Sequence, residues 1–393
     1  MPRFSPFPGI RYDTERVPIA DVIAPPYDVV DADEQQRLES RSTFNSIRVE
    51  LARADGDPYL AARERFDTWL SEGVLRQDRP SLYGYEMTGV DDLGVARRVV
   101  GVFGALDLAA GDVLPHEHTT PKAKSDRLDL LRATTTNTSP IWVLTPASIA
   151  SLVDTTKTPD ADVTDDDSVR HRLWVLDDDA ASAVTDAVTA APVVVADGHH
   201  RYETAKTYRD EVRSQHADAP GDHDAVLALV VELAPENLAV AAIHRLLLGI
   251  GGDAALDLLR PHFDLVALDS AEGIGAAMEQ SGSLGVLTAS GAWLAKPTAA
   301  TEDASAMDLD SSRLDVALRD LPADASVVFQ HGWRECADAV AKGDAGAAVL
   351  LRPATVEQIA AVGRGGDRMP PKTTFFWPKP RTGMVFRRLA PPA

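Results

Sequence analysis

Cysteine is almost absent from this chain of 393 residues, which contains only Cys336. A single cysteine excludes an internal disulfide and any cysteine-based zinc or iron–sulfur site within one chain. Cys336 lies in a helix-like context, and we expect a small buried hydrophobic residue. No apolar run approaches the roughly 18 residues that would span a bilayer, and the N-terminus lacks a charged-then-apolar signal pattern. These absences predict a soluble, cytoplasmic protein without a membrane partner.

Basic residues are also scarce, since 39 Lys and Arg face 60 Asp and Glu, and the net charge is −21. Lysine in particular is confined to a few positions. Such a field repels phosphate backbones, so a nucleic acid is not expected as a partner. Excess Asp, scarce Lys and 6% aromatic residues are typical of a halophilic, acidic proteome, in which salt screens the self-repulsion.

The hydrophobic pattern predicts a mixed α/β fold in which strands and helices alternate. Hydrophobic residues make up 45% of the chain, enough for one large domain or two to three smaller ones. Strands are predicted at 44–51, 81–87, 96–108, 139–146, 170–178, 192–198 and 225–233, helices at 32–39, 58–73, 178–190 and 200–215, and a closing extended segment at 373–389.

The stretch 155–168 is rich in Asp and Thr and is typical of a loop or linker. We therefore expect an α/β region at 1–155, with the motifs APPYD and HEHT, and a second at 168–393, with the motif ADGHHR. Both regions can form one compact unit.

The motif ADGHHR predicts an anion site where a buried strand hands over to a helix. Asp197 and Gly198 fall in the turn, and His199, His200 and Arg201 fall on the first helical turn. A helix N-terminus carries free N–H groups and a positive dipole end, glycine lets a ligand approach the backbone, and arginine grips phosphate oxygens. Asp197 can hold a magnesium ion or accept a proton from a hydroxyl. The alternative is a polar turn with a capping Asp and a surface Arg.

A second polar cluster surrounds the motif HEHT. If His116 and His118 are extended, both rings point to one side and can share a metal or an anion, although no third ligand at a fixed spacing supports zinc. The cluster continues with Glu117 and with the basic residues Lys122, Lys124 and Arg127. Basic side chains in an otherwise acidic chain are suited to bind a phosphate. The alternative is that these residues are exposed to solvent at the start of a helix.

A third candidate combines APPYD with NSIR. The two prolines make a rigid turn that can present Tyr27 and Asp28. Asn45 and Arg48 offer groups suited to the carboxylate of an amino acid, the alternative being a structural turn and a surface strand.

Two further places stay open. His244 and Arg245 follow an apolar segment and can be structural or functional. The tail holds Lys372, Lys379 and Arg381 among aromatic residues, and it can be a lid or a packed C-terminal strand.

These motifs together resemble a bacterial and archaeal family, the domain of unknown function 1015. The resemblance rests on GIRYD, IAPPYDVV, NSIRVEL, LPHEHTTPKAKSDRLDLL, ADGHHRYETA, IHRLL and FFWPKPRTG, which run nearly from end to end. Within that family, ADGHHR resembles the phosphate-binding signature of the ParB/sulfiredoxin-like nucleotide-binding fold, which archaeal free-serine kinases share. The resemblance therefore implies such a core with a large insertion, which includes HEHT, and a C-terminal extension.

The function implied by this resemblance is phosphoryl transfer between a nucleotide and serine, by a serine kinase or a kinase-like phosphoserine phosphatase. It implies ATP or ADP and Mg²⁺ as cofactors, a small-molecule substrate, and the turn from Asp197 to Arg201 as the phosphate and metal site. The serine kinases use a further acidic residue as catalytic base, for which Glu117 and Asp28 are the candidates. The insertion departs from the compact kinase pattern, so the substrate stays open.

The residues by themselves agree with this chemistry, because phosphoryl transfer needs charge neutralisation and alignment more than covalent chemistry. No GxxxxGK[ST] sequence is present, which disfavours a P-loop enzyme. Two alternatives are a metal-dependent hydrolase that uses His116, His118, Asp197 and His199, and a ParB-like nucleotide-gated binding module for DNA or a protein.

Overall fold

The computed structural model describes residues 3–91, 95–108, 113–115, 121–365, 369–370 and 372–390. The chain forms two compact units. Unit 1 comprises Met1–Ala239 and Pro378–Ala393, and unit 2 comprises Val240–Trp377. The predicted boundary segment 155–168 lies within unit 1 and contains the strand β9 (Ala161–Thr164). No helix in the described part of the chain combines the length and the apolar character needed to cross a membrane.

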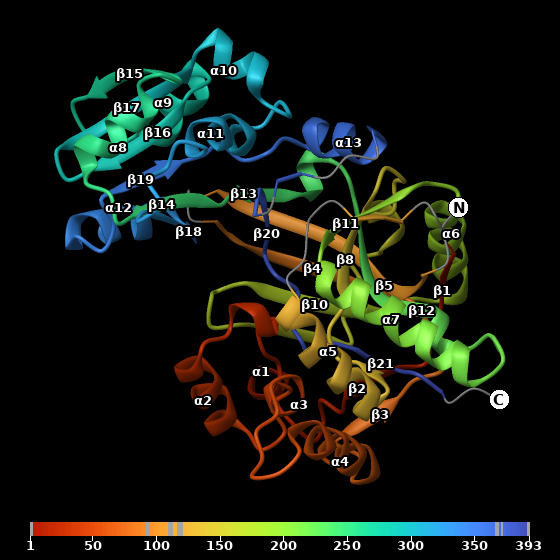
Figure 1. Ribbon diagram of the computed structural model, residues 1–393. Coiled ribbons are helices and arrows are strands. Elements are labelled where there is room, and N and C mark those ends of the chain that lie inside the picture. The colour runs from red at the N-terminus through yellow and green to blue at the C-terminus, as the bar shows by residue number, and fades with distance from the viewer. Residues whose placement is uncertain are drawn as a thin grey trace. The chain divides into compact units, whose positions relative to one another are not determined.

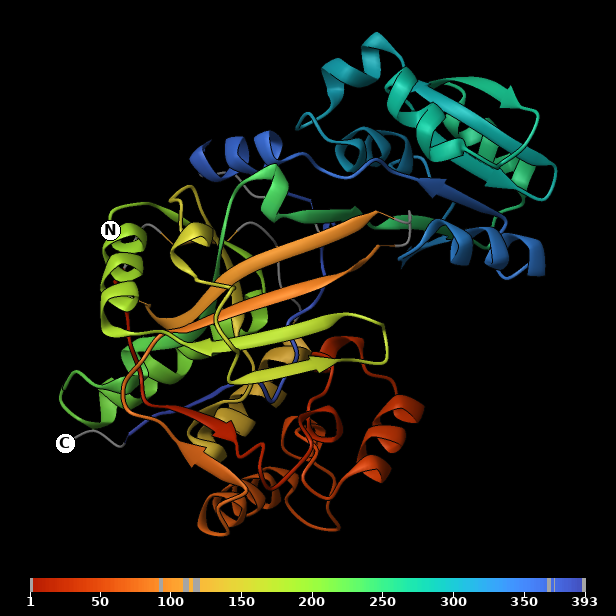
Figure 2. The same ribbon diagram turned by 180° about the vertical axis from the view of Figure 1, so that it is seen from behind.

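Unit 1 is built on two sheets. The larger sheet has the order β6-β11-β8-β12-β5-β4-β10-β9, with β1 beside β5, and the smaller has the order β3-β2-β21-β7. The strands are β1 (Phe4–Ser5), β2 (Gly9–Tyr12), β3 (Leu75–Gln77), β4 (Tyr83–Val90), β5 (Ala96–Asp107), β6 (Val113–Pro115), β7 (Thr136–Asn137), β8 (Ile141–Thr145), β9, β10 (Arg170–Val175), β11 (Val193–Asp197), β12 (Ala225–Glu232) and β21 (Phe386–Arg388). Figure 2 shows β4 and β5 running beside the hairpin of β9 and β10.

The helices of unit 1 pack on these sheets, and α5 and α7 lie side by side (Figure 1). They are α1 (Ile19–Val22), α2 (Ala32–Arg41), α3 (Ile47–Glu50), α4 (Pro58–Ser71), α5 (Pro121–Thr134), α6 (Asp178–Thr189) and α7 (His199–Gln215), with short 3₁₀ turns η1 (Tyr27–Val29), η2 (Ala150–Leu152), η3 (Asp222–Asp224) and η4 (Pro235–Asn237). Val184 of α6 and Tyr202 of α7 share one hydrophobic cluster with Val193 and Val195 of β11. This shared burial fixes α6 and α7 against β11 of the larger sheet.

Unit 2 contains an antiparallel sheet with the order β15-β17-β16-β19-β14-β18, and β13 pairs with β20. Its strands are β13 (Ala239–Ala242, which begins in unit 1), β14 (His244–Leu248), β15 (Phe263–Leu268), β16 (Leu284–Thr288), β17 (Gly291–Pro297), β18 (Ser326–Gln330), β19 (Ala347–Leu350) and β20 (Thr374–Trp377). Its helices are α8 (Gly252–Leu259), α9 (Ile274–Ser281), α10 (Ala299–Ala304), α11 (Asp310–Leu318), α12 (Trp333–Lys342) and α13 (Val356–Gly365).

The two faces of this sheet have separate cores, because successive strand residues point to opposite sides. Leu247 packs in the cluster that includes α8 and α11, whereas its neighbour Leu246 packs in the cluster that includes α9 and α12. Cys336 belongs to the second cluster and is fully buried, as predicted.

The predicted mixed α/β class is confirmed, and so are most predicted strands and helices, but two local predictions are wrong. Residues 44–51 were expected as a strand, yet Ile47–Glu50 forms α3. The Asn45 side chain accepts a hydrogen bond from the Ile47 N–H at 3.0 Å, which starts the helical turn. In the predicted loop 155–168, Ala161 and Val163 point inward and alternate with polar residues, so β9 forms beside β10.

Candidate functional site

The junction of β11 and α7 has the predicted strand, turn and helix. Val193 and Val195 of the strand β11 are fully buried, and the strand ends at Asp197. Gly198 is left-handed, with φ 86° and ψ 29°, and α7 begins at His199. A side chain is strained in this conformation, so glycine makes the sharp turn possible. The N-terminus of a 17-residue helix therefore lies next to the Asp197 carboxylate.

Asp197 is held by two cations. Its Oδ2 atom lies 2.7 Å from Lys379 Nζ and 3.7 Å from an Arg201 side-chain nitrogen. Burial opposes ionisation of Asp197, but the charges of Lys379 and Arg201 outweigh it and hold the pKa of this carboxyl well below its usual range. His199, which is buried, contributes in the same direction. Asp197 is therefore ionised at neutral pH.

These side chains are neither fully exposed nor sealed in the core. The exposed fraction is 23% for the Asp197 side chain and 12% for both Arg201 and Lys379. His200 is half-buried on the first turn of α7. The cluster thus lies at the edge of the protein interior, where an ion pair is only partly screened.

Arg201 also connects the junction to the segment before β8. Its guanidinium donates a hydrogen bond to the carbonyl of Pro140. Its Nε atom is buried and has no hydrogen-bond partner among the described residues. A Cβ atom at Gly198 would lie 3.1 Å from this guanidinium, so the glycine also provides room for it.

A second polar group is built around Glu50, which is 1% exposed. Arg127 donates to the Glu50 carbonyl at 2.9 Å and lies 3.4 Å from its Oε1 atom. The Ser139 hydroxyl donates to Oε1 at 3.0 Å, and the Arg127 guanidinium lies 4.4 Å from the ring centre of Tyr27. The Glu50 Oε2 atom is buried without a hydrogen-bond partner in the described part of the chain.

The two groups are adjacent, because Ser139 binds Glu50 while the next residue, Pro140, binds Arg201. Charged residues of both groups affect the pKa of Tyr27. Burial raises the pKa of Tyr27. The charges of Arg201 and Arg127 lower this pKa, and the charge of Glu50 raises it further. The structure therefore brings the predicted residues Tyr27 and Arg127 to the predicted junction.

Other predicted residues are placed differently. Asn45 is fully buried and donates to the carbonyls of Asp21 and Ile23, and Arg48 donates to the carbonyls of Glu39 and Ser42. Both side chains therefore bind backbone carbonyls, and their assignment to a substrate carboxylate stays a prediction. Asp28 is exposed on η1, beside Tyr27.

The HEHT motif is not among the residues that the structure describes. His116, Glu117 and His118 lie outside the described residues. Lys122 and Lys124 lie on the first turns of α5, whose backbone is described. Their assignment to a phosphate or substrate site stays a prediction.

The described residues contain no group of three or more His, Cys, Asp or Glu side chains suited to a metal ion. Four metal ligands were predicted for a hydrolase, and two of them, Asp197 and His199, are among the described residues. The Asp197 carboxylate accepts a hydrogen bond from Lys379.

Sequence reasoning missed Glu50 and Ser139, and it left the role of Lys379 open. Glu50 gave no signal of its own, because it is one of the polar residues in the alternating pattern of the predicted strand 44–51. Lys379 was detectable in principle, since lysine is rare in this chain and this one lies between two prolines.

Comparisons with known proteins give several solved structures with low similarity and one protein family. No curated protein matches it. Solved structures that resemble it include a conserved hypothetical protein from Pyrococcus furiosus, with 12% identity, a TM-score of 0.39 and coverage of 72% of this chain and 93% of that chain. A free serine kinase in complex with AMP has 13% identity, a TM-score of 0.39 and coverage of 71% and 87%. SbnI with a C-terminal truncation, from Staphylococcus aureus, has 12% identity, a TM-score of 0.39 and coverage of 72% and 86%.

The family comparison is more extensive. The model described as "Protein of unknown function (DUF1015)" matches residues 4–317, which includes the junction of β11 and α7. The chain belongs to this family.

Proposed function

We propose that the junction of β11 and α7 binds the phosphates of a nucleotide, and that the protein is a phosphotransferase for a small hydroxy amino acid. Serine kinase and kinase-like phosphoserine phosphatase are the two directions of this proposal. The observation that supports it most is the convergence of Lys379, Arg201 and the N-terminus of α7 around Gly198.

Each of these groups favours a phosphate. The first N–H groups of a helix have no partner within the helix and attract anions, and the left-handed Gly198 leaves space for an oxygen to approach the backbone. Arg201 adds a planar donor, and Lys379 adds a compact charge. In a chain with a net charge of −21, such a local concentration of cations marks a place for an anion.

Asp197 has two possible tasks in this proposal. In the described structure it neutralises Lys379 and Arg201, so the cations are held in place before a phosphate arrives. As an ionised carboxylate it can also accept the proton of a substrate hydroxyl. Glu117 and Asp28 stay candidates for this second task.

A magnesium ion fits the described residues only in a limited way. Mg²⁺ in phosphoryl-transfer sites usually takes one or two protein carboxylates together with substrate phosphates and water. The junction offers one carboxylate, Asp197, which would hold the ion. Magnesium would neutralise charge on the transferred phosphoryl group. We therefore expect metal binding to depend on the nucleotide.

Serine or phosphoserine is proposed as substrate because of the family resemblance of the ADGHHR turn. Tyr27, Arg127 and Glu50 are the polar groups next to the junction that are available to shape its surroundings. A metal-dependent hydrolase is less well supported, because Asp197, one of its two described ligands, is paired with Lys379.

The test combines ligand binding and turnover in molar salt. Thermal shifts are measured with ATP, ADP, pyrophosphate, L-serine and phosphoserine, each with and without Mg²⁺. A shift that needs nucleotide and Mg²⁺ together is expected, as well as nucleotide consumption with L-serine or phosphate release or ATP formation with phosphoserine. No shift with any polyphosphate, together with no turnover, would refute the proposal.

Two variants make the test specific to the junction. Asp197→Asn is expected to keep pyrophosphate binding, because it releases both cations, and to lower turnover by about 10²-fold or more. Lys379→Ala is expected to weaken pyrophosphate binding. Lys157→Ala is the matched control, since Lys157 pairs with Asp177 at 3.0 Å on the exposed surface.

A further inference from the structure

Residues 378–382 belong to unit 1 and are here named the C-terminal strap. Lys379 of the strap reaches Asp197, and Thr382 pairs with Ala24 through two backbone hydrogen bonds of 2.9 and 3.0 Å. The Ser46 hydroxyl donates to the Thr382 carbonyl at 3.1 Å. The strap thus joins the anion site to the N-terminal part of unit 1.

Between Lys379 and Thr382, Arg381 holds the strap against an acidic turn at 165–167. Its Nε atom donates to Asp165 at 2.6 Å, and its terminal nitrogen contacts both Asp165 and Asp167. The exposed fraction is only 8% for the Arg381 side chain and 7% for that of Asp165. The Arg381 N–H also donates to the Tyr85 hydroxyl at 3.3 Å.

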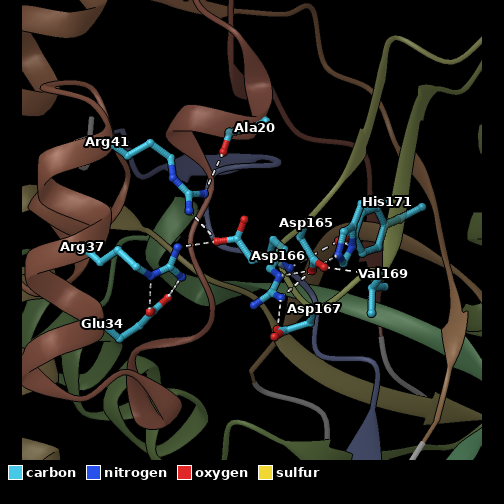
Figure 3. Close-up of polar contacts among 11 residues, drawn as sticks. Ala20, Glu34, Arg37, Arg41, Asp165, Asp166, Asp167, Val169 and His171 are labelled. Atoms are coloured by element: carbon cyan, nitrogen blue, oxygen red, sulfur yellow. Dashed lines mark hydrogen bonds and ion pairs between the residues drawn. The ribbon is translucent and has the colours of Figure 1, made fainter.

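The acidic turn that receives Arg381 is itself fixed from two sides (Figure 3). His171 is fully buried, with one ring nitrogen 2.7 Å from Asp165 and the other 2.7 Å from the Tyr85 hydroxyl. On the other side, Asp166 accepts from Arg37 at 2.6 Å and from Arg41, both on α2. Arg381 therefore binds a turn that side chains of β10 and α2 also hold.

We propose that Arg381 is a positioning residue for the anion site, because its attachment to Asp165 and Asp167 determines where Lys379 is presented. A lysine side chain has a flexible four-carbon stem, so the place of its charge depends on a fixed backbone. Arg381 lies two residues after Lys379, and the intervening Pro380 restricts the backbone between them. The inference rests on the proposed phosphate site.

The experiment is a double-mutant cycle of Lys379→Ala and Arg381→Ala in the full-length chain. Pyrophosphate affinity is measured by titration calorimetry, and stability is measured by urea unfolding of the same four proteins. Arg37→Ala is the matched control, because it removes an ion pair to the same acidic turn without touching the strap. Arg381→Lys keeps the charge and is expected to restore part of the loss.

If Arg381 positions Lys379, Lys379→Ala weakens pyrophosphate binding about tenfold or more in the wild-type background and less than about threefold beside Arg381→Ala. The urea midpoint follows the same pattern, because a displaced lysine no longer stabilises Asp197. Arg37→Ala leaves the effect of Lys379→Ala unchanged.

Additive effects of the two substitutions in both measurements would overturn the inference. Absence of pyrophosphate binding by the wild-type protein would instead count against the proposed phosphate site. The stability cycle would then still decide whether Arg381 places Lys379 at Asp197, so the two failures are distinguishable.

Discussion

Removal of the Lys379 charge should destabilise unit 1 much more than removal of an exposed lysine. At 2.7 Å, an ion pair with an effective dielectric constant of 20 has a gross Coulomb energy of about 6 kcal/mol. Desolvation cancels a large part of this, and the side chains are 12% and 23% exposed. Arg201 stays at 3.7 Å as a second partner of Asp197. We therefore expect Lys379→Ala to cost about 1.5–3 kcal/mol of unfolding free energy.

The assay is urea unfolding followed by the fluorescence of the tryptophans. With a urea dependence of about 3 kcal/mol per molar, the midpoint should fall by about 0.5–1 M. Lys157→Ala should leave the midpoint within error, because its partner Asp177 is as exposed as Lys157 itself. Added salt should narrow the difference for Lys379→Ala only slightly, because the pair is largely buried.

The pH dependence has a defined sign. The pKa of Asp197 in the folded state lies below that in the unfolded state, so its stabilisation is fully present above about pH 4 and is lost as the pH falls through the folded value. The difference between wild type and Lys379→Ala should therefore be constant between about pH 6 and 8. Equal midpoints for Lys379→Ala and the wild type at low salt would refute the reasoning.

Substitutions at three further positions test other parts of the structure. Gly198→Ala should cost about 1–3 kcal/mol and weaken pyrophosphate binding, because φ is 86° and the new Cβ would crowd Arg201; urea unfolding and calorimetry check this. Glu50→Ala should lower the free energy of unfolding by about 3 kcal/mol, because the buried Arg127 loses a carboxylate partner. Glu50→Gln should lower it less. Equal urea midpoints for Glu50→Ala and the wild type would contradict this. Burial, followed by the charge of Arg245, lowers the pKa of His244 to about 4. The free energy of unfolding of unit 2 should therefore fall by up to about 3 kcal/mol as the pH falls from about 6.5 towards 4. His244→Asn should make this free energy less dependent on pH, which unfolding at several pH values would measure.

Local patterns predicted the parts of the site that one segment forms alone. The valine run before Asp197, the glycine after it and the amphipathic helix that follows are sufficient to specify a strand, a left-handed turn and a helix. The same reasoning failed at 44–51, because the Asn45 side chain hydrogen-bonds to the backbone and favours a helical turn over the strand that the alternation predicts.

The acidic stretch 155–168 illustrates a different failure. Its composition is that of a solvated loop, but Asp165 is nearly buried because Arg381 and His171 surround it. The composition of a segment gives its number of charged residues, but it does not show which residues pair with them. The partners come from β10 and from the C-terminal strap, and the latter is more than 200 positions away in the chain.

By itself, the sequence determined the mixed α/β class, the family and the turn from strand to helix at Gly198, since each depends on neighbouring residues or on a recognisable motif. Only the tertiary structure decided that Lys379, 182 positions from Asp197, completes this turn, and that Glu50 and Arg127 lie next to it. The physical reason is that long-range ion pairs depend on how sheets and helices pack, and no local periodicity encodes that packing.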